Sequence, residues 1–130
     1  MAQFPRVKPH ESLEAWKRCH GLTLTVYRVT QSFPKIERYG ITSQMRRAAP
    51  SASANLVEGC AKRGVCDFRR FIDIAIGSLA EVSYYVLLAK DLGYLSIEDW
   101  NQVNKAAEEA GRTTMGLYKS ISRRVTAGQG

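Results

Sequence analysis

The sequence is poor in the residues that interrupt helices, with only four prolines and ten glycines among 130 residues. It also lacks segments in which apolar and polar residues alternate for long enough to predict a β-strand. Long apolar runs are absent too, since the longest charge-free run in the apolar part of the chain covers residues 82–89, which is too short to span a bilayer. These shortages exclude a β-sheet fold and predict that the protein has no membrane partner.

Cysteine is scarce as well, with Cys19, Cys60 and Cys66 as the three thiols. An odd number of cysteines, after a start without the apolar core of a signal peptide, predicts reduced thiols in the cytoplasm. Cys60 and Cys66 lie farther apart than the about two to four residues of a zinc hook. A metal site made of the three cysteines and His20 is the alternative, but we expect His20 to be a packed core residue. We predict neither a metal nor another cofactor.

Acidic residues are fewer than basic ones: 12 Asp and Glu stand against 19 Lys and Arg, which gives a net charge of +7. This excess predicts attraction to polyanions, of which nucleic acid is the commonest in a cell. The apolar fraction of 45% and the length of 130 residues are typical of one globular domain with a single core.

The first predicted helix begins after Ser12, a plausible N-cap. It ends by Ser32, because a proline at position 34 disfavours the helical region for the residue before it. Its apolar positions step by three and four, and they are Leu13, Trp16, His20, Leu24 and Tyr27.

The second predicted helix covers residues 42–62, with Thr42 as its N-cap and Gly64 just after its end. Pro50 lies inside it, and its ring should clash with the carbonyl of Arg46. We therefore predict a kink or a break at this point.

The third predicted helix starts after Asp67 and runs to about Leu92. Its main apolar stripe comprises Phe68, Phe71, Ile72, Ala75, Leu79, Val82, Val86 and Ala89. A second stripe beside it comprises Ile74, Tyr85, Leu88 and Leu92. A helix apolar over so much of its circumference exceeds what one bundle core needs, which predicts self-association.

The fourth predicted helix opens at Ser96 and lasts to about Arg124. Its apolar positions are Trp100, Val103, Ala107, Ala110, Thr114, Leu117 and Ile121. The four helices and their short links predict an all-α, antiparallel up-down four-helix bundle over residues 12–124. A flexible arm is expected over residues 1–11 and a disordered tail over residues 125–130.

Two neighbouring faces of the second helix suggest a tight helix–helix contact. The small face comprises Ala48, Ala52, Leu56 and Gly59, and the polar face comprises Arg47, Ser51, Asn55, Glu58 and Lys62. Small residues let another helix approach closely, so we interpret the polar face as bonding across the bundle. The alternative is that Glu58 acts as a general acid or base with Glu81. No nucleophile, metal set or phosphate loop accompanies these carboxylates, and we expect that the protein is not an enzyme.

Several motifs together resemble a known family. They are Trp16, Phe33-Pro34 with Glu37 and Gly40, Gln44-x-Arg46-Arg47-Ala48, Asn55-x-x-Glu58-Gly59, and Gly77-Ser78-Leu79 with Glu81. Over residues 12–122 the sequence resembles the four-helix-bundle proteins encoded in intervening sequences of bacterial 23S ribosomal RNA genes. The sequence departs from that pattern at one point, because Ser53 stands where the family usually has proline and Pro50 comes earlier.

The resemblance implies a ring-shaped homopentamer without enzymatic activity. It also implies kinship with the accessory variability proteins of diversity-generating retroelements, which are basic pentamers that bind nucleic acid and a reverse transcriptase. In this chain it makes Asn55, Glu58, Gly59, Ser78 and Glu81 a structural motif.

Basic residues gather in groups that suit the phosphates of RNA or DNA. One face of the fourth helix carries Lys105, Arg112, Lys119 and Arg123, with Arg124 at its end. The link between the second and third helices is flanked by Lys62, Arg63, Arg69 and Arg70. The second helix adds Arg46 and Arg47. Only Tyr118 interleaves as an aromatic residue, so we predict non-specific binding without base readout. The alternative function is a scaffold that holds an acidic or nucleic-acid-processing protein partner, and a solvated face without a ligand is the simplest explanation of such charges.

Overall fold

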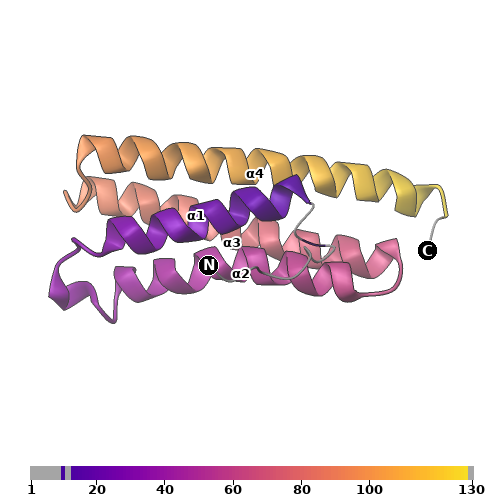
Figure 1. Cartoon of the computed structure of the whole chain (residues 1–130), viewed down its shortest axis with the longest axis horizontal. Coiled ribbons are helices and arrows are strands. Elements are labelled where there is room, and N and C mark those ends of the chain that lie inside the picture. The colour runs from indigo at the N-terminus through magenta and orange to yellow at the C-terminus, as the bar shows by residue number, and fades with distance from the viewer. Residues whose placement is uncertain (1–9, 11–12, 129–130) are drawn as a thin grey trace, which may run out of the picture.

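The computed structural model describes residue 10 and residues 13–128. This part of the chain is helical and contains no strand, so the predicted all-α fold is confirmed (Figure 1). The elements are α1 (Glu14–Thr30), the short 3-10 helix η2 (Lys35–Glu37), α2 (Ile41–Ala61), α3 (Val65–Asp91) and α4 (Ile97–Thr126).

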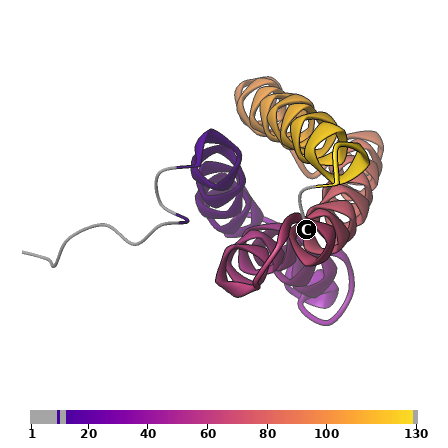
Figure 2. The ribbon, with the colours of Figure 1, turned by 90° about the vertical axis from the view of Figure 1, so that its right-hand side faces the viewer.

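The four long helices lie side by side along the molecule (Figures 1 and 2). Both α1 and α3 pack against α2 and α4, so α1 and α3 occupy opposite corners of the bundle. Figure 1 shows the α2–α3 link and the end of α4 at one end of the molecule, which we call the α2–α3 link end. The α1–α2 and α3–α4 links lie at the opposite end.

Several helix termini differ from the sequence-based prediction. α2 begins at Ile41 instead of after Thr42, and α3 begins at Val65, before the predicted cap Asp67. Gly64 precedes α3 with φ of 89°, a conformation that glycine adopts without steric cost, so the chain turns there without a capping side chain. Ser96 caps α4 as predicted, since its hydroxyl accepts the Asp99 N–H at 3.1 Å.

The ends of the chain also require corrections. Ser12 and most of the predicted arm lie outside the described residues, and α1 follows Leu13 without a side-chain cap. α4 continues to Thr126, so the first two residues of the predicted tail are helical.

α2 runs through Pro50 without a break, so of the predicted kink or break the break is excluded. Proline removes one N–H from the helical hydrogen-bond ladder. The neighbours Ala48, Ala49 and Ala52 are completely buried in the core. Packing on both sides of Pro50 therefore holds the helix together where local propensity would interrupt it.

The buried face of α1 is not the predicted one. The core takes Ala15, Cys19, Leu22, Val26 and Val29, none of them aromatic. Of the predicted stripe, His20, Leu24 and Tyr27 are exposed, so His20 is not a core residue. The helix carries two apolar stripes, and the bulkier one faces outward.

The core stripes of α3 and α4 agree with the prediction. Seven of the eight residues of the main α3 stripe are buried, all except Phe68. By length and composition α3 could also cross a membrane, the same property that core helices of bundles show. Here its buried face packs against α2 and α4.

One carboxylate joins the two links at the end opposite the α2–α3 link. Glu37 accepts the Tyr94 hydroxyl at 2.7 Å through one oxygen and the Ile41 N–H at 3.4 Å through the other. A Cβ on Gly40 would lie 2.5 Å from Glu37 Oε1, so a larger residue there would displace this carboxylate from its cap. The ring of Phe33 packs 5.5 Å from that of Tyr94. These contacts explain why phenylalanine, glutamate and glycine occur together in this stretch.

The pKa of Tyr94 is raised, first by its hydrogen bond to Glu37 and then by burial and the carboxylate charge. Because the folded pKa exceeds the unfolded one, the hydrogen bond stabilises the fold fully below about pH 10, and this stabilisation disappears as the pH rises through the folded pKa. We expect Tyr94→Phe to be less stable than the wild type at pH 8, with the difference shrinking at alkaline pH. Urea unfolding across this range measures it, with exposed Tyr39→Phe as the control. A difference that stays constant with pH would contradict the assignment.

Candidate interaction surfaces

A polar seam crosses the contact between α2 and α3. Arg47 forms an ion pair with Glu81, and one turn further along α2 the Ser51 and Ser78 hydroxyls share a hydrogen bond of 3.0 Å. Asn55 donates to the Ser51 carbonyl at 2.8 Å, within α2. These contacts engage Ser51, Ser78 and Glu81 with side chains of α2 and α3, and the Arg47–Glu81 pair lies at the edge of the seam, partly open to solvent.

Glu58 does not belong to this seam. It is exposed, and among the described residues it forms no hydrogen bond or ion pair. Its neighbour Gly59 lies against Phe68 and Phe71, ten residues before Glu81 along α3, which is about 15 Å of helix. The two carboxylates are therefore not brought together, and Glu58 does not bond across the bundle as the polar-face interpretation predicted.

The candidate metal ligands are also dispersed. Cys19 is buried with its sulfur 3.5 Å from the Thr114 hydroxyl, and burial raises the pKa of its thiol although that hydrogen bond lowers it. His20 stacks on Trp16 with ring centroids 4.9 Å apart, on the outside of α1. Within the described part of the chain no three His, Cys, Asp or Glu side chains are grouped to hold a metal ion.

Arg46 and Arg47 are committed to contacts within the bundle. Arg46 donates to the Thr30 hydroxyl at 2.8 Å and to the Tyr27 carbonyl at 3.3 Å, and its guanidinium lies 4.9 Å from the centre of the Tyr27 ring. It thus joins α1 to α2, as Arg47 joins α2 to α3. Either arginine would have to give up these contacts to bind a phosphate.

Most of the other basic residues converge at the α2–α3 link end. Tyr118 of α4 lines a groove with Arg69 and Arg70 of α3, which places the end of α4 beside the start of α3. Two clusters that are separate in the sequence thereby become one, which we call the basic end: Lys62, Arg63, Arg69, Arg70, Lys119, Arg123 and Arg124. Residues 58–73 and 118–128 hold these seven cations against three acids, Glu58, Asp67 and Asp73.

Lys105 and Arg112 lie elsewhere. Both are exposed on α4, but Lys105 precedes Lys119 by fourteen residues, or about 21 Å of helix. The predicted basic face of α4 therefore extends along the bundle, and only its last part joins the basic end.

Two apolar faces remain exposed on opposite corners of the bundle. On α3, Ile74, Tyr84 and Leu87 are 44%, 58% and 45% exposed. On α1, the outward stripe includes Leu24, which is 59% exposed, and Tyr27. Of the predicted second stripe of α3, Ile74 and Leu92 are exposed, whereas Tyr85 and Leu88 pack against the core. The outward stripe of α1 was assigned to the core by the sequence pattern.

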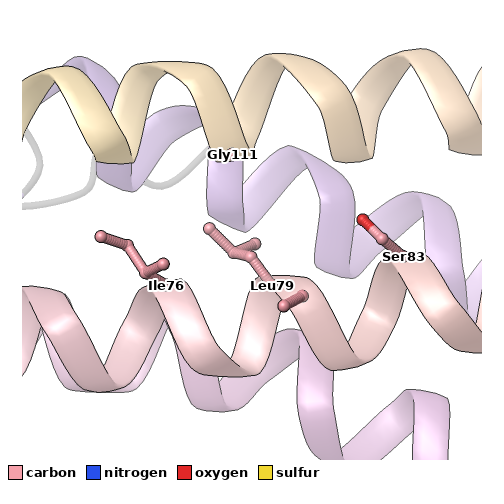
Figure 3. A pocket seen from close by; sticks show the side chains of 5 residues that line it. Ile76, Leu79, Ser83 and Gly111 are labelled. Carbon is pink, nitrogen blue, oxygen red and sulfur yellow. The ribbon is translucent and has the colours of Figure 1, made fainter.

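A shallow apolar groove lies between α3 and α4 (Figure 3). It is lined by Ile76, Leu79, Ala80 and Ser83 of α3 and Gly111 of α4, with a volume of about 190 Å³. The small residues leave the space open, so this side of α3 can accept side chains from another molecule.

Comparisons with known proteins agree with this architecture. The model of the 23S rRNA-intervening sequence protein family matches residues 11–116. A crystal structure of a protein of unknown function from the S23 ribosomal protein family of Bacteroides thetaiotaomicron superimposes with a TM-score of 0.73 at 17% identity, covering 81% of this chain and 95% of that one. At this identity the likeness concerns the fold alone, and no curated protein matches the sequence. Because the family model spans most of the four-helix bundle, the chain belongs to the 23S rRNA-intervening sequence protein family.

Proposed function

We propose that the protein is a non-enzymatic, ring-shaped homo-oligomer of up-down antiparallel bundles that binds nucleic acid non-specifically through its basic end. The convergence of seven Lys and Arg side chains from the α2–α3 link, α3 and α4 at one end of the bundle carries this proposal. A pentamer is the expected size, as the resemblance to the 23S rRNA intervening-sequence proteins implies.

The exposed apolar faces support the assembly. An interface between two different faces of neighbouring copies is heterologous, and such interfaces form a ring when the rotation from copy to copy closes. The α1 face and the α3 face lie at opposite corners of the bundle, so each copy could present one face to each neighbour. Burying residues such as Tyr84 and Leu87 removes apolar surface from water at about 25 cal/mol per Å².

The charge distribution supports nucleic acid as the ligand. Each phosphate that a Lys or Arg neutralises releases counterions, so a cluster of exposed cations suffices for non-specific binding. A ring repeats the basic end once per copy, and linked weak sites gain affinity through effective concentration. RNA and DNA carry the same phosphates and both suit this surface.

Exchanging cations at the basic end tests the proposal. With Arg63→Gln/Arg123→Gln, the slope of log affinity against log salt for duplex DNA should flatten by about 0.9 for each phosphate that the variant no longer neutralises. Lys35→Gln/Arg38→Gln is a matched control, because it removes the same charge from exposed residues at the opposite end. Fluorescence anisotropy at several salt concentrations measures both slopes.

Equal slopes for the two double variants would show that net charge alone acts and would contradict a binding surface. If the wild type binds neither RNA nor DNA at about 50 mM salt, where phosphate contacts are strong, nucleic-acid binding is refuted. The alternative function, a scaffold for an acidic protein partner, would then be favoured.

A further inference from the structure

We infer that the groove between the start of α3 and the end of α4 binds single-stranded nucleic acid, with phosphates on Arg69 and Arg70 and a base against Tyr118. This inference rests on the proposed function and names the form of nucleic acid that the basic end prefers. The groove is lined by Cys66, Arg69, Arg70, Asp73 and Tyr118 and has a volume of about 430 Å³.

The two arginines are available for a ligand. Arg69 forms no hydrogen bond or ion pair with any described residue. Arg70 makes its contacts within α3, with its guanidinium 4.0 Å from Asp67 and 4.6 Å from the centre of the Phe71 ring. In this they differ from Arg46 and Arg47, whose guanidinium groups hold the bundle together. A backbone phosphate can therefore be bound here without breaking a helix contact.

Tyr118 adds an aromatic ring to the positively charged groove formed by Arg69 and Arg70. Its side chain is half-buried, so the ring is partly fixed and partly open to a ligand. Aromatic side chains beside a basic backbone track are the common means of holding single strands, because every base can stack on them. In a duplex the bases are already stacked on each other, so a duplex can offer this groove only its phosphates.

Asp73 affects where the phosphate and the base of a bound strand would lie in the groove. Its carboxylate repels phosphate and so directs the backbone toward the arginines. It can also accept a hydrogen bond from an exocyclic amine of a base, as acidic side chains do with cytosine. The groove thus has distinct places for a phosphate and for a base.

The test compares labelled single strands of about twelve nucleotides, oligothymidine and oligouridine, with a duplex of the same length. Tyr118→Leu should weaken binding of the single strands about tenfold, leave the duplex unchanged and leave the salt slope unchanged. Tyr118→Phe, which keeps the ring, should bind like the wild type. Arg69→Gln/Arg70→Gln should weaken all ligands and flatten the salt slope, whereas Lys35→Gln/Arg38→Gln and Tyr39→Leu serve as matched controls at the opposite end.

The outcomes separate the inference from the function on which it rests. If Tyr118→Leu weakens the binding of single strands and duplex equally, or weakens neither, the stacking site is refuted. Salt-dependent binding by the wild type would still support the proposed function. If the wild type binds no nucleic acid, both fail. Should Tyr118→Leu unfold, photocrosslinking of a halogenated-uracil strand to the wild type decides: a crosslink at Tyr118 supports the groove, and one confined to other helices overturns it.

Discussion

Replacing Leu87 with glutamate on the exposed face of α3 is expected to dissociate the assembly into monomers of 14.5 kDa. Leu87 and its neighbour Tyr84 are exposed on the outward side of α3, which we place in the proposed contact between copies. Burying an unpaired carboxylate there costs several kcal/mol, and about 3 kcal/mol already weakens a contact more than a hundredfold. Size-exclusion chromatography with light scattering measures the mass.

A matched control is Ile36→Glu. Ile36 is 88% exposed and lies in η2, at the end of the bundle opposite the α2–α3 link. It should leave the mass of the assembly unchanged. An oligomer that survives Leu87→Glu and Ile74→Glu together would place the contact on another face of the bundle.

Placing leucine at Gly59 is expected to cost about 3 kcal/mol of folding free energy. α2 and α3 approach so closely at Gly59 that an added Cβ would lie 2.8 Å from a ring carbon of Phe68 and 3.0 Å from the Cβ of Phe71. The Phe71 Cβ moves only with the backbone of α3, so the two helices must separate to make room. Denaturant unfolding gives the difference in stability.

Gly21→Leu is the control for this substitution. Gly21 lies within α1, is exposed, and has no atom within 4 Å of an added Cβ. Leucine has a better helix propensity than glycine by up to about 1 kcal/mol, so this variant should be as stable as the wild type or slightly more stable. Similar stability losses in both variants would mean that the close approach at Gly59 does not restrict the side chain.

The fold could be predicted because local signals agreed with packing. Three of the four helices bury the stripes that their periodicity indicates, and Ser96 caps α4 with the expected hydrogen bond. The prediction for α1 failed because a second stripe of large residues, with Leu24 and Tyr27, faces outward. Periodicity gives the spacing of an apolar stripe. Which of two stripes is buried depends on the size of the core space that the neighbouring helices leave open.

The candidate surfaces were harder to predict because they depend on contacts between distant residues. Arg46 and Arg69 look alike in the sequence, yet Arg46 binds Thr30 and Tyr27 on another helix while Arg69 lines an open groove. The basic end could have been inferred from the alternation of helices, which brings the start of α3 beside the end of α4. The groove around Tyr118 depends on side-chain placement, which no local pattern encodes.

Sedimentation velocity of the wild type with a dye-labelled single strand, followed at the wavelength of the dye, tests self-assembly and nucleic-acid binding together. We expect the strand at low salt to sediment with a protein species several times heavier than 14.5 kDa, and to return to its own slow boundary at high salt as phosphate contacts are screened. A strand that sediments alone at low salt, or that travels only with a 14.5 kDa monomer, would contradict the account.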